Sequence, residues 1–307
     1  MLFQNIRLLR DIAQLRSVSR AAAASGISQS AASQQMQEME RRLGIALFDR
    51  GTRPLTLTPA GKLFHSLCRD VARREEKFQI DLEKLTGAVE GSVRVASIYS
   101  VGLSEMSQIQ EQFTANFPSA QLHVDYMRPE KVYEAVLDDQ ADLGLVSYPE
   151  RSRDLAVIRW REEEMAVAAP PSHPFAKRRA LKPADLGGEQ FVGFDEELPI
   201  RRAQDRFFKE QGIEIRLHAQ FDNIQMIKEA VVQGLGLAIL PARIMEDEIE
   251  QGRLVAIRLD APGLVRPVGI VHRKHKRFNR AAKSFLAILQ EKHVSQRRRV
   301  RRETQGK

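Results

Sequence analysis

Hydrogen-bonding side chains gather just after a Ser-Gly-Ile turn at residues 25–27. Ser28 is a good N-cap for a helix that begins there, and another short helical segment precedes the turn. This arrangement is typical of a helix-turn-helix, whose second helix places its first residues in the major groove of DNA. A helical hairpin with capping serines is the alternative. The side chains that could bond base edges and phosphates are Gln29, Ser30, Ser33 and Gln34.

The residues after this helix favour the DNA-binding interpretation. Gly44 stands at the usual C-terminal stop position of the helix. Residues 47–50 and 55–57 then alternate like two short strands, with residues 51–54 as the turn between them. A helix-turn-helix followed by a β-hairpin is a winged arrangement, and Arg53 at the tip could reach the DNA backbone or the minor groove.

The pattern resembles the N-terminal domain of LysR-type transcriptional regulators. The matching motifs are Ser19-Arg20-Ala21-Ala22, Ser28-Gln29, Met39-Glu40, Leu43-Gly44, Leu47-Phe48-Asp49-Arg50 and Leu57-Thr58-Pro59-Ala60-Gly61. Met39 replaces the usual Leu, and Ser30 the frequent Pro. The resemblance implies a sequence-specific DNA-binding regulator. Its DNA contacts are then expected from helix-turn-helix residues 18–37 and the wing, through Ser19, Arg20, Ser28, Gln29, Ser30, Ser33, Gln34 and Arg53.

A long helix is predicted next, with Thr58 as its N-cap and Pro59 as its first residue. Apolar residues recur at steps near 3.5 along it, while the opposite face is charged. This stripe favours dimerisation through a coiled coil, and the alternative is packing on the helix's own domain. The single cysteine, Cys68, falls among apolar neighbours and is expected to be packed. The stripe consists of Phe64, Leu67, Val71, Phe78, Leu82 and Leu85.

Beyond Gly91 the pattern alternates between strands and helices, which favours an α/β domain with a parallel type of sheet. Two such lobes joined by two crossings resemble a periplasmic-binding-protein module and the effector domain of LysR-type regulators. The predicted strands are 92–97, 121–126, 141–146, 155–160, 164–169, 191–194, 216–221, 237–240 and 268–271, and the predicted helices are 104–116, 132–138, 201–211, 223–233 and 279–293. The fold class is therefore α/β, with an N-terminal winged helix-turn-helix, a long linker helix and a two-lobed periplasmic-binding-protein-like effector domain.

A small-molecule effector is expected between the lobes, where helix N-termini and strand ends converge. Ser100 follows the first strand and would offer its hydroxyl to an anionic or polar group, as the equivalent residue of the family does. Its alternative role is a simple N-cap. Tyr99 and Tyr148 would add apolar walls. The predicted effector-binding residues are Ser100, Val101, Ser147, Phe194, Asn223 and Ile224.

Other function classes find little support in the residues. The seven histidines form no catalytic spacing, so we expect no enzyme, no catalytic residue and no cofactor. His272 and His275 have a metal-compatible spacing without a third ligand nearby, and no metal site is expected. Residues 234–236 read Gly-Leu-Gly but follow a helix, so they are interpreted as a helix end rather than a dinucleotide fingerprint. A purely architectural DNA-binding protein would not explain a two-lobed domain.

Charge is unevenly distributed: residues 1–90 carry a net +4, residues 91–270 a net −7 and residues 271–307 a net +11. We expect a DNA-binding domain at 1–58, a linker at 59–87, an effector domain at 91–296 and a basic tail at 297–307 that stays disordered. Within the effector domain, we expect one lobe at 91–161 with 269–293 and the other at 162–268. No segment is apolar enough for a membrane, so a cytoplasmic location is expected. The implied partners are promoter DNA, an effector, RNA polymerase and copies of the chain, as a dimer or tetramer.

Overall fold

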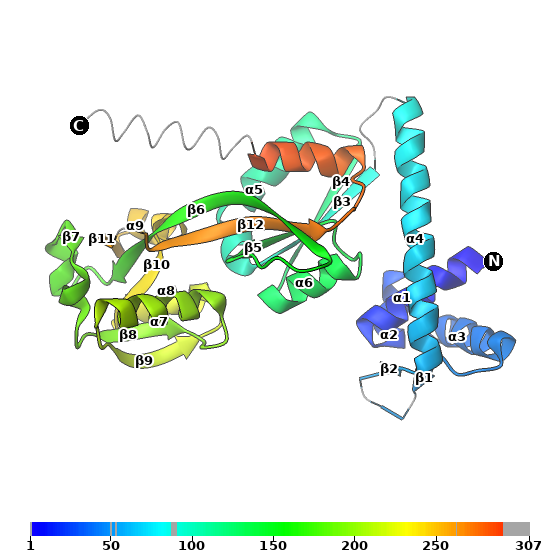
Figure 1. The fold of residues 1–307 in the computed structure, drawn as a ribbon, viewed down its shortest axis with the longest axis horizontal. Helices are drawn as coiled ribbons and strands as arrows, with labels where there is room; N and C mark the ends of the chain where they lie inside the picture. The colour runs from blue at the N-terminus through cyan, green and yellow to red at the C-terminus, as the bar shows by residue number, and fades with distance from the viewer. Residues whose placement is uncertain (1, 50, 53, 87–90, 262, 291–307) are drawn as a thin grey trace. The chain divides into compact units, whose positions relative to one another are not determined.

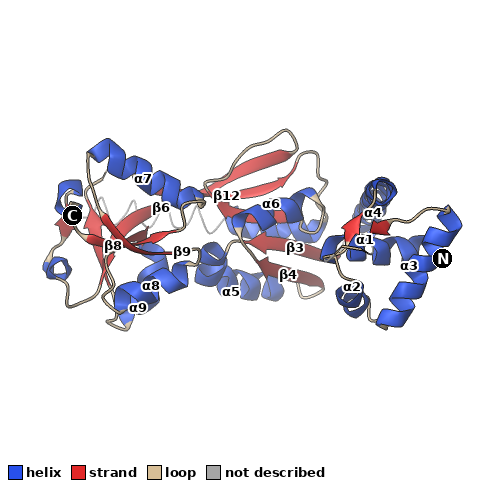
Figure 2. Cartoon of the chain, turned by 90° about the horizontal axis from the view of Figure 1, so that it is seen from below, coloured by secondary structure: helices blue, strands red, loops and turns tan. Residues whose placement is uncertain are grey.

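The computed structural model describes residues 2–290 except 50, 53, 87–90 and 262. The chain forms two compact units, one ending at Thr86 and the other beginning at Gly87 (Figure 1). Each unit has a hydrophobic core of its own. The elements of the first unit are almost all helices, whereas the second combines helices with strands (Figure 2).

The first unit is a three-helix bundle followed by a small hairpin and a long helix. The turn between the second and third helices is closed by Ser28, whose Oγ accepts a hydrogen bond from the N–H of Ala31, and Gly44 ends the third helix in a left-handed conformation. The predicted helix-turn-helix and wing strands are therefore confirmed. The elements are α1 (Leu2–Leu15), α2 (Val18–Ala24), α3 (Gln29–Leu43), β1 (Phe48–Asp49), β2 (Thr56–Leu57) and α4 (Pro59–Thr86).

Helix α4 begins as the sequence predicts. The Thr58 hydroxyl accepts a hydrogen bond from the N–H of Gly61 at 3.0 Å, and Pro59 occupies the first helical position. Phe64 packs against the core of the first unit, whereas Leu67 and Phe78 are 52% and 59% exposed. Cys68 is fully buried, and burial raises the pKa of its thiol to about 11, which fits the expected packing role.

The second unit has two lobes. Lobe 1 comprises residues 91–160 and 268–290, and lobe 2 comprises residues 165–264. In lobe 1, Phe113 of α5 meets Phe285 edge-on, with ring centroids 5.8 Å apart, so a helix at residues 280–290 lies beside α5. The other elements of lobe 1 are β3 (Gly91–Ser97), α5 (Tyr99–Asn116), β4 (Ala120–Tyr126), α6 (Pro129–Leu137) and β5 (Leu143–Ser147).

Two long antiparallel strands connect the lobes: β6 (Leu155–Ala169) and β12 (Val265–Arg273). The sequence predicted two strands, 155–160 and 164–169, with a break between them, and that prediction is wrong. The charged residues 161–164 look like an exposed turn, but Arg161 and Glu163 are buried and the strand continues through them. A bulge at Trp160 shifts the register between the two strands.

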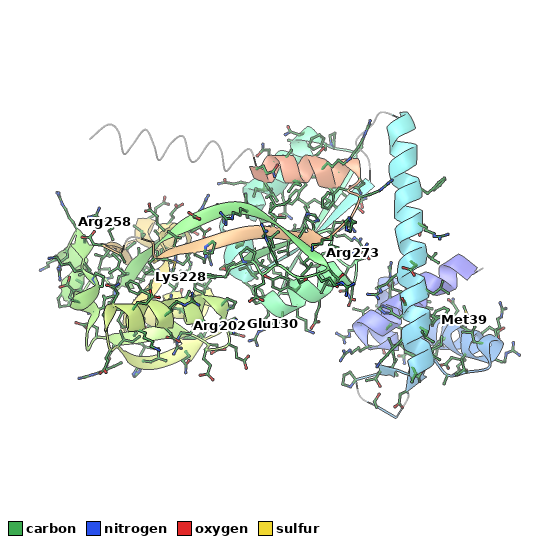
Figure 3. All side chains as sticks on the ribbon, viewed as in Figure 1. Met39, Glu130, Arg202, Lys228, Arg258 and Arg273 are labelled. Carbon is green, nitrogen blue, oxygen red and sulfur yellow. The ribbon has the colours of Figure 1, made fainter. Side chains whose placement is uncertain are left out.

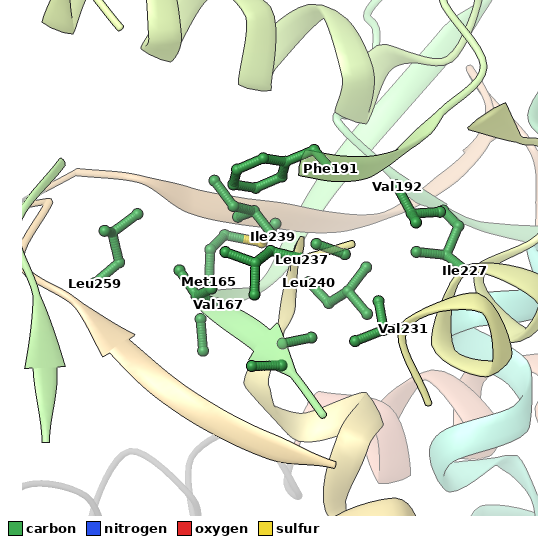
Figure 4. Close-up of a cluster of buried hydrophobic side chains, with 14 of the residues drawn as sticks. Met165, Val167, Phe191, Val192, Ile227, Val231, Leu237, Ile239, Leu240 and Leu259 are labelled. Atoms are coloured by element: carbon green, nitrogen blue, oxygen red, sulfur yellow. The ribbon is translucent and has the colours of Figure 1, made fainter. Parts of the chain in front are cut away.

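Lobe 2 packs helices and short strands around the far half of β6. Its core combines Val167 of β6 with Ile227 and Val231 of α8 and with Leu240 of β10 (Figure 4). Gln204 is also buried, and its amide donates to the carbonyl of Ile239 at 2.7 Å. The elements are β7 (Ala180–Leu181), β8 (Gln190–Phe194), α7 (Pro199–Gln211), β9 (Arg216–Phe221), α8 (Ile224–Val232), β10 (Ala238–Pro241), α9 (Glu246–Glu250), β11 (Val255–Leu259) and 3₁₀ turns at Pro174–Lys177, Pro183–Leu186 and Ala242–Met245.

Two further expectations need correction. The main sheet, of order β4-β3-β5-β12-β6-β11-β7, is mixed rather than parallel, because β6 and β12 run antiparallel to each other and β12 runs antiparallel to β5. Helix α5 starts at Tyr99, five residues before the predicted Ser104. Gly102 hid this start, since glycine is a poor helix former, but it packs directly on the ring of Tyr126, where a side chain would not fit.

Candidate DNA-binding surface and effector cleft

The N-terminal end of α3 presents polar side chains that the fold leaves accessible. Gln29, Ser30 and Gln34 are exposed, and Ser33 is half-buried. The opposite face of the helix holds Ala32, Met36 and Met39 in the core, and Figure 3 labels Met39. Because one face is fixed by packing, the other can enter a major groove without distorting the helix.

The remaining predicted DNA contacts lie around this surface. Ser19 and Arg20 of α2 are exposed, and the Arg20 guanidinium donates to the carbonyl of Leu15 at 2.6 Å. The hydroxyls of Ser28 and Ser30 are 2.9 Å apart. Arg53 and Arg50, both predicted in the wing, lie outside the described residues.

One residue of α3 has a positioning role that the sequence pattern did not reveal. A carboxylate oxygen of Glu40 accepts hydrogen bonds from the backbone N–H groups of Leu47 and Phe48, at 2.8 and 3.1 Å. These bonds tie the first wing strand to the recognition helix. Glu40 thus fixes the position of β1 relative to α3.

A partly open cavity of about 280 Å³ lies between lobes 1 and 2. Four helices begin at its wall: α5 and α6 from lobe 1, and α7 and α8 from lobe 2. The N-cap residues of α5, α6 and α7 provide no side-chain cap, whereas Asn223 caps α8. Figure 3 labels Glu130 on α6 and Arg202 on α7, one from each side. The lining consists of Ile98, Tyr99, Ser100, Met127, Arg128, Pro129, Ser147, Phe194, Leu198, Pro199, Ile200, Asp222, Asn223, Ile224 and Arg266.

A buried ionic cluster lies where the crossing strands pass the cavity. Arg266 of β12 donates through Nε to Glu163 of β6 at 2.7 Å, and a second nitrogen of its guanidinium also meets that carboxylate. Arg161 donates to the other oxygen of Glu163 at 2.7 Å. The side chains of these three residues are at most 5% exposed. Burial lowers the pKa of the Arg266 guanidinium, while the Glu163 carboxylate acts in the opposite direction.

The cluster extends to the cavity wall and to the strand bulge. Arg266 donates from Nη1 to the hydroxyl of Ser100 at 2.8 Å. At the other end, the Arg161 guanidinium stacks on the ring of Trp160, 4.2 Å from the ring centroid. The sequence pattern assigned none of these charges a role, because Arg266 lies 103 residues from Glu163 in the chain.

Five of the six predicted effector-binding residues line the cavity: Ser100, Ser147, Phe194, Asn223 and Ile224. Val101 is fully buried and lies outside the lining. Tyr99 lines the cavity, whereas Tyr148 lines a separate hollow beside β6 and β12. Ser100 is not an N-cap, since Ile98 holds that position and Ser100 is the second residue of α5.

The mouth of the cavity carries an ion pair between the lobes. Arg128 at the start of α6 lies 3.6 Å from Asp222, which precedes α8. Both side chains are 48% exposed, so this pair contributes little to stability. The pair nevertheless joins an element of lobe 1 to an element of lobe 2.

Other site types find no support in the part of the chain that the structure describes. Within it, no group of three or more His, Cys, Asp or Glu side chains is arranged to hold a metal ion. His272 instead contacts the carbonyl of Arg273 and the ring of Phe278. Among the described helices, none combines the length and the apolar character needed to cross a membrane.

A winged helix-turn-helix joined to a two-lobed domain with a cavity between the lobes defines a ligand-responsive DNA-binding protein. Residues 3–62 match the family of bacterial regulatory helix-turn-helix proteins of the lysR type, and residues 86–293 match the LysR substrate binding domain. The chain belongs to the LysR family of transcriptional regulators, which are not enzymes.

Relatives and solved structures agree with this assignment. The RuBisCO operon transcriptional regulator of Allochromatium vinosum is 30% identical over 282 residues, which cover 92% of this chain and 93% of the relative. The structure of full-length CbnR with its target DNA is similar with a TM-score of 0.66 at 20% identity, covering 95% of this chain and 99% of that one. The Synechocystis PCC6803 CcmR regulatory domain in complex with 2-PG has a TM-score of 0.61 at 20% identity, covering 66% and 98%.

Proposed function

We propose that ligand occupancy of the cleft between lobes 1 and 2 changes how this regulator binds and bends a promoter dyad. The observation that carries the proposal is the cavity between the lobes, whose wall comes from both lobes and includes Ser100, Ser147, Phe194, Asn223 and Ile224. A ligand that contacts both lobes favours one of their relative arrangements. Its binding free energy then biases DNA binding by linkage.

The DNA contacts in this proposal come from α3, α2 and the wing. The accessible side chains at the start of α3 supply base recognition, and Arg53 supplies a backbone or minor-groove contact. The DNA-binding domain is residues 1–58, the linker helix 59–87 and the effector domain 91–296. RNA polymerase is the further partner, and the cytoplasm, where promoter DNA is found in bacteria, is the location.

Homo-oligomerisation as a dimer or tetramer, with α4 as the principal contact, completes the proposal. The exposure of Leu63, Leu67 and Phe78 supports it, because large apolar side chains on one helix favour a partner surface. The double variant Leu67→Glu/Val71→Glu should sediment as a monomer and bind one half-site weakly. A Lys62→Gln/Ser66→Glu double variant changes the net charge by the same amount at exposed polar positions and controls for it. A dimeric double variant with full-site affinity would show that the contact lies elsewhere.

The effector proposal is tested by DNA binding with and without ligand. Operator fragments are selected from genomic DNA by the full-length protein, and affinity and bending are then measured with increasing 2-PG, the compound in the CcmR structure. We expect a saturable change in the wild type and none in a Ser147→Ala/Asn223→Ala variant that still binds the operator. If saturating ligand binds the protein but leaves affinity and bending unchanged, the linkage is absent.

A further inference from the structure

A second hollow lies beside the crossing strands β6 and β12, and we call it the strand hollow. Its wall comes from residues 148–151 after β5, residues 157–162 of β6 and residues 267–268 of β12. None of its lining residues also lines the effector cleft. Its volume is about 940 Å³, which lies in the range of roughly 300–1,000 Å³ that is typical of small-molecule sites.

The strand hollow is rich in positive charge. Arg151, Arg159 and Arg161 line it, together with one acidic residue, Glu162. The Arg161 guanidinium is bound to Glu163 at 2.7 Å. Arg151 and Arg159 are exposed, and neither forms an ion pair with any residue that the structure describes. Each of these two guanidinium groups can bind a phosphate or carboxylate group through two parallel hydrogen bonds, so the hollow suits a ligand that carries more than one such group.

A bulge in β6 brings the arginines of this strand to the hollow. Arg159 pairs with Gly269 across the two crossing strands. The next pair joins Arg161 to Val268, so Trp160 is the extra residue of the bulge. The Arg161 guanidinium lies over the Trp160 ring, 4.2 Å from the ring centroid. Bulges redirect side chains, and this one explains why two arginines of one strand line the same hollow.

The strand hollow also has an apolar wall. Pro149 lies directly on the backbone of Gly269, where a Cβ atom would come within 2.6 Å of the proline Cγ. Pro267 and Val157 are half-buried and line the same hollow. Proline rings present flat apolar faces, against which a planar ring of a ligand can pack. Charge and a flat apolar wall are thus combined in one hollow.

We propose that the strand hollow is a second ligand site, separate from the effector cleft, which binds a phosphorylated compound with a planar ring system, the chemistry of a nucleoside diphosphate. Arg151 and Arg159 bind the phosphate groups, and Pro149 and Pro267 contact the ring. A small monocarboxylate would engage only one guanidinium and would fill little of the 940 Å³. An acidic protein segment is the alternative occupant, but a hollow walled by three segments of the chain favours a compact ligand.

The test uses probes that separate the charge from the ring. The affinities of ADP, adenosine and pyrophosphate for the full-length protein are measured by equilibrium dialysis at constant ionic strength, and GDP is measured beside ADP. We expect a nucleoside diphosphate to bind at least about ten times more tightly than adenosine or pyrophosphate, because only the complete molecule contacts both the arginines and the proline wall. Fluorescence of Trp160, the single tryptophan, should change on binding because this residue lines the hollow.

Variants of the exposed arginines test the charge recognition. Arg151→Gln/Arg159→Gln should weaken nucleoside diphosphate binding at least about ten-fold and leave adenosine binding unchanged, because adenosine has no phosphate group. The matched control is Arg153→Gln/Arg258→Gln, which removes two charges at exposed positions outside the hollow and should retain the affinity. Figure 3 labels Arg258. Thermal unfolding of each variant checks that the fold is retained.

A cleft variant shows which of the two sites is occupied. Ser147→Ala/Asn223→Ala alters only the effector cleft and should keep the wild-type affinity for ADP and GDP. Loss of nucleotide binding in this variant, or its full retention in Arg151→Gln/Arg159→Gln, would overturn the second site. No saturable binding of either nucleotide to the wild type would also overturn it. If a tetraglutamate peptide binds instead, the strand hollow is a docking surface for an acidic protein segment.

Discussion

The DNA-binding end of α3 and the effector cleft are built in opposite ways. The first is contiguous: a serine cap, a helix of fifteen residues and a terminal glycine fix it locally, and its functional groups are exposed. The second is assembled from both lobes and depends on buried charges whose partners, Glu163 and Arg266, are 103 residues apart. Substitutions on a contiguous exposed surface can change binding with little effect on the stability of the fold. In a cleft assembled from both lobes, a substitution that changes ligand binding also changes the stability of the fold.

Removing the carboxylate of the buried cluster should have the largest effect. Glu163→Ala leaves Arg161 and Arg266 buried without their shared partner, and losing one member of a buried ion pair costs about 3–5 kcal/mol. Urea unfolding of the full-length protein, followed by Trp160 fluorescence, measures the free energy of unfolding. Glu162→Ala, at the exposed neighbour, should cost far less. Similar losses for both variants would show that the cluster has no special role.

A side chain added at a glycine of α4 should strain the packing inside the first unit. A Cβ atom on Gly61 of α4 would overlap the carbonyl oxygen of Leu47, which also accepts a hydrogen bond from the N–H of Thr58. Gly61→Val should therefore cost about 1–3 kcal/mol and loosen the wing. Amide hydrogen exchange in peptides from residues 1–86 should be faster in the Gly61→Val variant than in the Lys62→Val variant. Lys62→Val is the control, because it places the same side chain at an exposed position. Unchanged exchange would mean that α4 shifts without strain.

Substitutions on the exposed face of α3 should alter recognition and leave stability unchanged. Gln29→Ala should cost about 1–3 kcal/mol of binding to the selected operator and relax sequence preference, because base contacts carry that discrimination. Gln37→Ala, exposed farther along the same helix, is the control. Fluorescence anisotropy with operator and scrambled duplexes provides the measurement. If Gln29→Ala weakens both duplexes equally, Gln29 makes no base contact.

The smallest effect is expected from a buried acid whose contribution depends on pH. Burial alone would raise the pKa of Asp142, but Lys276 and Arg94 lower it below its ordinary value of 3.8. Its stabilising contribution is therefore present above about pH 4 and is lost as pH falls through the lower pKa of the folded state. Asp142→Asn should be less stable than the wild type at pH 7, with the difference narrowing at pH 3. Asp125→Asn, at an exposed site of β4, should show no such trend.

Local signals explain what the sequence could predict. Ser28, Gly44, Thr58 and Pro59 act on the backbone within a turn of their own positions, so the helix ends they specify were predictable. The cleft residues Ser147 and Phe194 were predictable because each ends a buried strand. These features need no knowledge of the tertiary fold.

Long-range features were not predictable in the same way. Residues 161–164 resemble a charged surface turn, and only pairing with Arg266 reveals that the strand continues through them. The start of α5 was hidden because the packing of Gly102 on Tyr126 outweighs the poor helix propensity of glycine. Helix α1 is a further element for which no sequence motif gave a prediction. The positioning role of Glu40 became visible only with the wing in place.

The crossing strands β6 and β12 affect the order in which the two lobes can fold during synthesis. The core of lobe 2 runs from Met165 to Leu259, whereas the core of lobe 1 needs both residues 93–160 and residues 268–289, including Phe285. A chain emerging from the ribosome therefore completes lobe 2 before lobe 1, although lobe 1 begins first. Until Phe285 has emerged from the ribosome, the ring of Phe113 lacks the side chain that packs against it. Chaperone binding to nascent chains should accordingly concentrate on the earlier half of lobe 1 and end once the last helix has been synthesised.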